Sequence, residues 1–214
     1  MVFFFVCNVV DPPMVVYMGA DKHENEELLK YGLSEDIWFH VDKLSSAHVY
    51  LRPPRDMAVE DIPEAAITDC VQLVKANSIQ GNKLNGIDVV YTPYPNLKKT
   101  GDMVVGQVGF HSDKAVKKVR VEKRVNEIVN RLNKTKVEKH PDLREERDER
   151  EQEDARDRRR AAKKREEEEK VLEKERKEQA ALRSYDTLMD SSKMEMNDYG
   201  SDPVDARAVE DDFM

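Results

Sequence analysis

Charged residues are sorted along this chain, and that sorting limits which part of it can fold around a core. Residues 141–183 are almost entirely Glu, Asp, Arg, Lys, Ala and Gln, with too few apolar side chains to pack a domain. Residues 1–135 have the apolar content and length of one ordinary domain. We therefore expect a folded domain over 1–135, a charged helix over 136–188 and a disordered acidic tail over 189–214.

The pattern within the first part predicts an α+β domain: an antiparallel sheet with two packed helices, followed by the long charged helix and the tail. Helical spacing over 59–77 predicts one helix, and the capping pair Asp21 and Glu24 predicts another that ends near Gly32. A third helical pattern begins at Arg124 and is expected to leave the domain. About seven strands are expected, at 2–6, 14–18, 37–42, 47–52, 87–91, 104–110 and 116–121.

The charged segment has the spacing of an exposed helix rather than of a continuous coiled coil. An acid precedes a base by four residues in Glu146/Arg150, Asp154/Arg158, Glu166/Lys170 and Glu173/Lys177. Its few apolar residues do not form the repeating seam that a coiled coil buries. We expect a solvated helix, with pairing to a protein partner or to a second copy through 141–183 as the alternative.

One face of the two strands expected at 37–42 and 47–52 carries an unusual set of side chains. Strict alternation directs Ile37, Phe39 and Val41 into a core. The opposite face gathers Trp38, His40, His48, Tyr50 and Arg52. We interpret this polar and aromatic face as a ligand-contacting surface.

The same histidines do not make a recognisable metal or catalytic site. His40 and His48 lack a third ligand at any established spacing, and Ser45 and Ser46 lack the Gly-flanked turn of an activated serine. The sequence therefore predicts no metal, no cofactor and no catalytic residue. An RNA-modifying enzyme that depends on these histidines stays the third hypothesis.

A basic block follows an acidic one, which points to a polyanionic partner. Residues 1–97 have a net charge of −7, whereas residues 98–139 have a net charge of +7. Tyr91 and Tyr94 precede this block and offer stacking planes, so phosphate contacts and stacking would suit single-stranded or looped nucleic acid. The basic side chains of the block are Lys98, Lys99, His111, Lys114, Lys117, Lys118, Arg120, Lys123, Arg124, Arg131, Lys134, Lys136 and Lys139.

Lys22, His23 and Asn25 mark a weaker anion site, where the free amides of a helix start would hold a phosphate. The acidic residues around them count against this site.

The two cysteines and the N-terminal residues indicate in which cellular compartment the protein is expected. Cys7 and Cys70 lie among apolar neighbours without a C-x-x-C spacing, so we expect two buried free thiols in a reducing compartment, cytoplasmic or nuclear. The apolar start at residues 1–10 lacks a basic region and a cleavage pattern, and it is too short to span a bilayer. We expect a buried strand there, with peripheral membrane contact left open.

Several motifs resemble the NFACT-R family. They span Asp36–Leu51, Leu73–Gly81, Val90–Pro93, Asn96–Thr100 and Gly106–His111. The resemblance implies an RNA-binding module of the kind found in large quality-control factors that bind stalled 60S ribosomal subunits and peptidyl-tRNA. It implies functional roles for Asp36, Trp38, His40, Ser46, His48, Lys98, Lys99 and His111.

These observations favour a non-enzymatic nucleic-acid-binding adaptor with a charged helix. The predicted contact residues are Trp38, His40, His48, Arg52, Lys98, Lys99, His111, Lys117 and Lys118. The sequence does not distinguish RNA from DNA as the ligand. Association with ribosomal complexes is a further possibility that it leaves open. The alternative is a protein scaffold that docks partners or anionic membrane surfaces through the charged helix.

Overall fold

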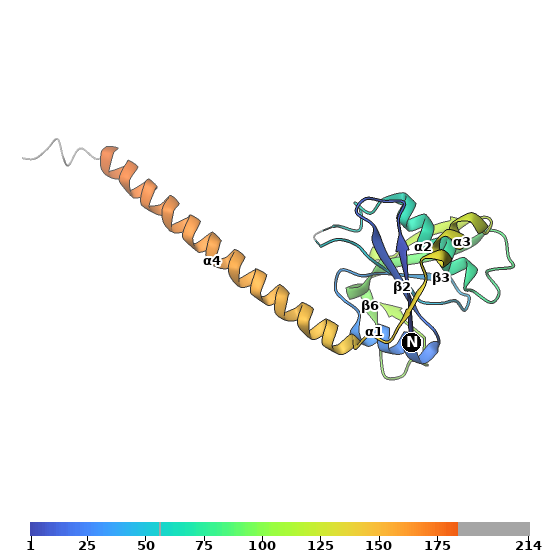
Figure 1. Ribbon diagram of the computed structural model, residues 1–214. Helices are drawn as coiled ribbons and strands as arrows, with labels where there is room; N and C mark the ends of the chain where they lie inside the picture. The colour runs from blue at the N-terminus through green and yellow to red at the C-terminus, as the bar shows by residue number, and fades with distance from the viewer. Residues whose placement is uncertain (56, 184–214) are drawn as a thin grey trace, which may run out of the picture. The chain divides into compact units, whose positions relative to one another are not determined.

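A seven-stranded antiparallel sheet organises the first part of the chain in the computed structural model, which describes residues 1–55 and 57–183 (Figure 1). Its strand order is β8-β5-β3-β4-β2-β1-β9, and a separate two-stranded sheet pairs β6 with β7. The strands are β1 (Val2–Cys7), β2 (Met14–Gly19), β3 (Ile37–Val41), β4 (Val49–Arg52), β5 (Ile87–Pro93), β6 (Leu97–Lys98), β7 (Gly109–Phe110), β8 (Lys117–Val121) and β9 (Val137–Lys139).

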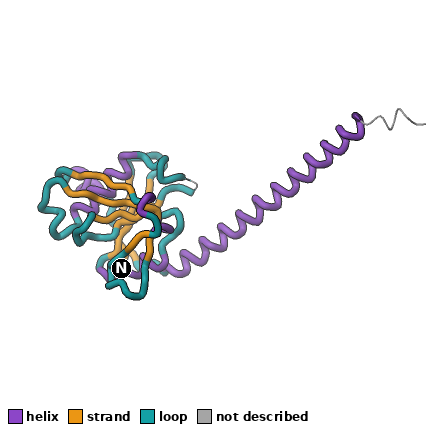
Figure 2. The backbone as a smooth tube through the Cα atoms, turned by 180° about the vertical axis from the view of Figure 1, so that it is seen from behind, coloured by secondary structure: helices purple, strands orange, loops and turns teal. Residues whose placement is uncertain are grey.

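Four α-helices and two short 3-10 helices accompany these strands in the described residues (Figure 2). They are α1 (Lys22–Tyr31), α2 (Glu64–Ala76), η1 (Tyr94–Asn96), η2 (Asp113–Ala115), α3 (Asn126–Lys134) and α4 (Leu143–Arg183). The predicted α+β class and the long charged helix are confirmed. The tail expected at 189–214 lies outside the described residues.

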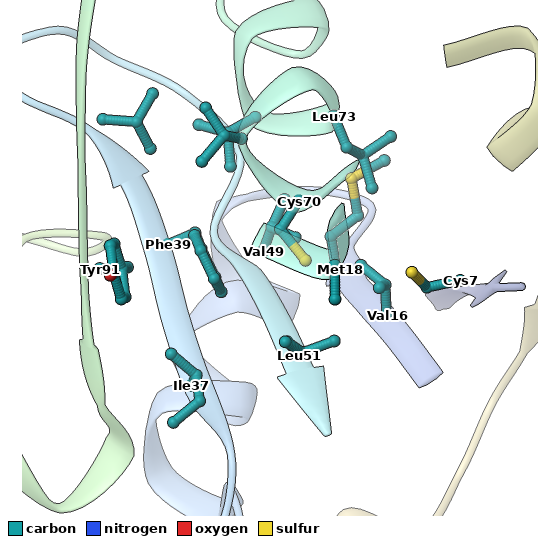
Figure 3. Packing of buried hydrophobic residues seen from close by; sticks show 14 of the residues in the cluster. Cys7, Val16, Met18, Ile37, Phe39, Val49, Leu51, Cys70, Leu73 and Tyr91 are labelled. Atoms are coloured by element: carbon teal, nitrogen blue, oxygen red, sulfur yellow. The ribbon is translucent and has the colours of Figure 1, made fainter. Parts of the chain in front are cut away.

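The main core lies between one face of the large sheet and helices α2 and α3. Alternation in β3 works as predicted, since Ile37, Phe39 and Val41 all enter this core. Cys70 and Leu73 of α2 pack against strand residues there (Figure 3). This apolar layer fixes the register of the central strands, because a slip of one residue would expose it.

The opposite face of the sheet carries a second, smaller core. It contains Tyr17, Trp38 and Tyr50 from the strands and Leu28 from α1. Partly buried side chains from the β6–β7 hairpin complete it, among them Phe110. The sheet is therefore covered on both faces.

Both cysteines are buried and free, as expected. The Cys7 thiol donates to Asp69 Oδ2 at 3.2 Å, and burial with this carboxylate raises the pKa of Cys7 to about 12. Because the thiolate is the reactive form, such a thiol is inert at neutral pH.

Helix α1 begins and ends where its sequence signals indicated. Asp21 caps it, and its carboxylate accepts the amides of His23 and Glu24. The chain turns away at Gly32, where a Cβ atom would come within 2.3 Å of the Tyr94 ring. A glycine is required there by this close approach.

Three expected boundaries were wrong for local reasons. Helix α2 starts at Glu64 rather than 59, because Pro63 occupies the N-cap position. The strand expected at 47–52 begins only at Val49. The strand expected at 104–110 is limited to Gly109–Phe110, and the residues before it form a loop.

The chain after residue 121 also differs from expectation. Helix α3 packs against α2 instead of leaving the domain, with Val129 and Leu132 buried. Strand β9 then pairs with β1 beyond the boundary placed at residue 135. The compact unit runs over Met1–Arg156 and so includes the start of α4, while the remainder of α4 belongs to a second unit.

Lys75 is a buried lysine that the sequence did not single out. Its ammonium donates to the carbonyls of Gly81 and Leu84 at 3.0 and 2.5 Å, and it closes the loop after α2. Burial lowers the pKa of Lys75, since the charged form is desolvated.

Within the described ranges, no helix has the length and apolar character needed to cross a membrane.

The packing of the main core predicts that truncation of Phe39 lowers the stability of the protein. Phe39 is fully buried and stacks on Tyr91 with ring centroids 5.3 Å apart. We expect Phe39→Ala to lower the free energy of unfolding by about 3–5 kcal/mol in urea denaturation. Val104→Ala, at a site that is 72% exposed, should change it by less than about 0.5 kcal/mol. Equal effects of the two substitutions would contradict this assignment of the core.

Candidate nucleic-acid interface

Trp38, His40 and His48 lie together on the second face of the sheet, as the strand alternation predicted. The indole N–H of Trp38 donates to Nδ1 of His48 at 3.1 Å. The two imidazole rings have centroids 4.9 Å apart, and the ring of His40 stacks on Trp38 at 5.4 Å. The expected cluster therefore exists.

The expectation that this cluster is an open surface was wrong. Trp38 and His48 are each only 3% exposed. Phe110 of the β6–β7 hairpin packs edge-on against Trp38 at 5.9 Å. Since the hairpin covers the rings, Trp38 has no free face on which a base could stack.

Lys99 helps to hold the loop that joins β6 to β7 in place over Trp38 and His48. Its ammonium pairs with Glu26 of α1 at 2.9 Å and donates to the carbonyls of Val104 and Gln107 at 2.9 and 3.0 Å. The amide of Gly106 also donates to Glu26, at 3.0 Å. Lys99 and Glu26 thus fold the loop of residues 99–108, and the sequence analysis did not identify Glu26 as the partner.

The two imidazoles are neutral. His48 accepts from Trp38 through Nδ1, which leaves that nitrogen without a proton. Burial, together with the neighbouring His40, lowers the pKa of His48 to about 3. Burial also lowers the pKa of His40, whose Nδ1–H donates to the carbonyl of Val41 at 2.8 Å.

Arg52 was expected to contact nucleic acid, but it mainly serves a buried carboxylate. Its Nε and Nη2 donate to Asp36 at 2.9 and 3.2 Å. Asp36 is fully buried and also accepts from the Tyr17 hydroxyl at 2.5 Å and the Leu33 amide at 2.9 Å. Four donors satisfy the oxygens of this carboxylate, so its burial leaves no unpaired acceptor.

Tyr91 and Tyr94 do not offer the stacking planes expected of them. Tyr91 is 7% exposed and stacks on Phe39 in the main core. Tyr94 is partly buried, and its hydroxyl donates to the carbonyl of Leu29 at 2.8 Å. The rings of these tyrosines are therefore engaged in packing within the domain.

Many of the basic side chains after residue 98 are paired with acids, contrary to the expected strip of free positive charge. Lys117 pairs with Glu60 at 3.1 Å, and Lys118 pairs with Asp42 at 2.7 Å. Further pairs join Arg120 to Glu122, Arg131 to Asp69 and Lys136 to Glu138. Each acid cancels most of the field that its partner would offer to a phosphate.

Lys98, His111 and Lys114 are exposed and, within the described part of the chain, make no ion pair. Lys98 lies on β6 opposite Gly109, while His111 and Lys114 follow β7. Elsewhere in the basic block, Lys123, Arg124, Lys134 and Lys139 also have no acidic partner among the described residues, although Arg124 bonds Asn82.

Buried Asn96 fixes the base of the hairpin that presents this group. Its side-chain amide donates to Thr92 Oγ1 and to the carbonyl of Ser112, both at 2.9 Å. The amides of His111 and Ser112 donate back to its backbone and side-chain oxygens at 2.9 and 2.8 Å. These bonds fix the backbone of His111 and Ser112 beside Asn96, two residues before Lys98 on β6.

The weaker anion site at Lys22, His23 and Asn25 is not supported. Asp21 already accepts the helix-start amides that were expected to be free for a phosphate. Asn25 is buried, and Glu24 pairs with the N-terminal amine instead of capping the helix.

Asp36 predicts a large loss of stability when its charge is removed. Asp36→Asn removes the buried carboxylate to which the partly buried Arg52 donates twice, so we expect a loss of about 3–5 kcal/mol in urea denaturation. Asp113→Asn, at an exposed site, is the control and should change stability by less than about 0.5 kcal/mol. A neutral result for Asp36→Asn would show that Asp36 does not anchor this network.

The buried imidazoles predict a loss of stability in acid. The unfolded chain binds protons near pH 6.5, whereas the pKa of His48 in the folded protein is about 3. Between these values the unfolded state holds more protons, so stability falls as pH falls, by up to about 1.4 kcal/mol per pH unit for each histidine.

His48→Gln keeps an acceptor for Trp38 and removes this titration. Chemical denaturation at a series of pH values from neutral to acid should give a shallower dependence for the variant. The slope is the readout, so a general loss of stability does not confuse the test. Identical slopes for the two proteins would contradict the assignment.

Comparison with known proteins places the chain in a family. The family model described as "NFACT protein RNA binding domain" matches residues 1–112. Coiled-coil domain-containing protein 25 of Danio rerio is 57% identical over the full length of both chains, and its Mus musculus counterpart is 53% identical over 94% of this chain and 98% of its own. Protein JLP2 of Saccharomyces cerevisiae is 43% identical over 64% of this chain and 69% of its own.

One solved structure shares the fold. The C-terminal part of the fibronectin/fibrinogen-binding protein from Streptococcus suis superposes with a TM-score of 0.50 at 19% identity, over 63% of this chain and 49% of that one. The family match and the full-length relatives agree with the motifs recognised in the sequence. The chain belongs to the NFACT-R family of RNA-binding domains.

Proposed function

We propose that this protein is a non-enzymatic adaptor that binds single-stranded or looped RNA mainly through phosphate contacts at the β6–β7 hairpin. The observation that carries this proposal is a set of exposed basic side chains: Lys98 on β6, and His111 and Lys114 in the segment that follows β7, whose start Asn96 holds in place. Membership in the RNA-binding family supports the class of ligand.

The burial of the aromatic cluster shapes the proposed mode of binding. Since Trp38 and Tyr91 are covered, the affinity would come from charge rather than from base stacking. Binding of this kind has little sequence preference and depends strongly on salt. Stalled ribosomal complexes, suggested by the family resemblance, are the proposed setting, in the cytoplasm.

The buried histidines support an adaptor rather than an enzyme. A general base must reach its substrate within hydrogen-bond distance. His48 lies beneath the hairpin, and its Nδ1 is engaged by Trp38. We therefore assign His40 and His48 to the architecture of the hairpin.

A second candidate, a protein scaffold, is favoured by one observation on α4. Val171 and Leu172 are 58% and 57% exposed on an otherwise charged helix. Neighbouring apolar residues on an exposed helix would suit a protein partner or a second copy. Loss of partner binding upon Val171→Ser with Leu172→Ser, with RNA binding unchanged, would favour this candidate.

The adaptor proposal predicts that Lys98 of the hairpin and Lys114 of η2 are needed for RNA binding. In gel shifts with single-stranded RNA, Lys98→Glu with Lys114→Glu should weaken binding by about tenfold or more at about 50 mM salt. The slope of log affinity against log salt should become shallower by about 1.4, because two phosphate contacts are lost. Parallel titrations with single-stranded and duplex DNA would show whether the site prefers RNA.

Lys83→Glu with Lys163→Glu is the matched control. Both lysines are exposed, lie outside the hairpin and, within the described residues, make no ion pair. This variant has the same net charge as the hairpin variant and should bind almost as well as the unmodified protein. Equal losses for the two variants would refute a hairpin site.

A further inference from the structure

The start of α4 contacts the domain through a polar stripe. Leu143, Glu146, Arg147, Arg150 and Asp154 are partly buried, whereas most residues between them are exposed. Their spacing of three or four residues places them on one face of the helix. This stretch, residues 143–156, belongs to the compact unit and is termed the proximal segment.

Carboxylates of the proximal segment lie close to two arginines of the domain. Arg52 is the last residue of β4, and Arg55 follows three residues later. Glu153 Oε2 lies 2.6 Å from Nη2 of Arg55, and Asp154 Oδ1 lies 3.6 Å from the same atom. Glu146 Oε2 lies 3.9 Å from Nη1 of Arg52. The Nε and Nη2 of Arg52 are taken by Asp36, so Nη1 is the atom directed toward the helix.

The remaining contacts of the proximal segment are also mostly polar. Arg147 Nη1 donates to the carbonyl of Lys30 at 2.8 Å, and Arg150 pairs with Glu35. Leu143 is the member of the segment that joins the apolar packing of the second core. Attachment that depends on partly exposed charge pairs is weakened by salt.

Ion pairs within the helix occur in both parts of α4, and the proximal segment has one between Arg147 and Glu151 at 2.8 Å. In the second unit, Glu166 pairs with Lys170 at 2.6 Å and Glu173 pairs with Lys177 at 2.7 Å, as the helical spacing predicted. In the proximal segment, Asp154 pairs with Arg55 rather than with Arg158. The carboxylate of Asp154 therefore connects the helix to Arg55 of the domain.

We propose that Arg52 and Arg55 form a phosphate-binding site which the carboxylates of Glu146, Glu153 and Asp154 occupy, so that RNA and the start of α4 compete for the same guanidinium groups. The inference rests on the proposed function and adds a second contact region and a means of regulating it. A guanidinium binds carboxylates and phosphates with the same fork of N–H donors, which makes a carboxylate a suitable substitute for a phosphate.

This arrangement gives RNA a reciprocal effect on the helix. A phosphate bound at Arg55 displaces Glu153 and Asp154, and the proximal segment then loses two of its charged contacts with the domain, which weakens its attachment. A detached, highly charged helix with no apolar face is only marginally stable and frays. RNA binding and release of the proximal segment are therefore linked events.

The test removes two carboxylate charges with minimal change of shape. Glu153→Gln with Asp154→Asn removes two carboxylates that pair with Arg55, so single-stranded RNA should bind about twofold to fivefold more tightly, the range expected for one exposed ion pair. Hydrogen exchange without RNA should be faster at the amides of 143–156, because the segment is less firmly attached. Adding Arg55→Gln to this variant should abolish the gain in affinity.

Glu167→Gln with Glu169→Gln is the matched control on the same helix. Both residues are exposed, and the change in net charge is identical, so this variant measures the effect of charge alone. A gain in affinity no larger than that of the control would overturn the competition, as would a gain that survives Arg55→Gln. Failure of the unmodified protein to bind RNA would instead refute the proposed function, while the exchange measurement would still report whether these carboxylates attach the segment.

Discussion

The buried carboxylate of Asp36 is the interaction on which the arrangement of the second face depends. Through its side chain it joins Tyr17 of β2, Arg52 of β4 and the amide of Leu33 after α1. Its own carbonyl accepts the amide of Tyr94, where η1 begins. Because a buried charge is tolerated only when fully paired, these segments must come together as one unit. The same Arg52 then faces the start of α4.

This network explains why we propose a recognition surface at the hairpin rather than on the sheet. Residues that look functional in isolation, Trp38 and His48, are used to support the β6–β7 hairpin and the loop of residues 99–108. Lys99 and Glu26 also hold that loop. The structure thereby presents Lys98, His111 and Lys114 at its surface, and a rigid mounting reduces the entropy that ordering them on a phosphate backbone would cost.

Paired charges have two roles in this protein. Pairs such as Lys118 with Asp42 simply neutralise a solvent-facing strand. The pairs between Arg55 and the proximal segment join two parts of the chain that are separated by about a hundred residues in sequence. Only pairs of the second kind can couple ligand binding to a change in helix position, because their loss releases a segment instead of a side chain.

The sequence by itself determined the α+β class, the alternation that sends Phe39 into the core and Trp38 to the opposite face of the sheet, the capped helix at Asp21 and the existence of a long charged helix. These features follow from local periodicity and capping, which act over a few residues. Tertiary structure alone decided that Trp38 is covered, that Lys99 meets Glu26 and that Asp154 meets Arg55. Exposure and ion pairing depend on segments distant in sequence, and a count of charges along a chain cannot show which acid each base will face.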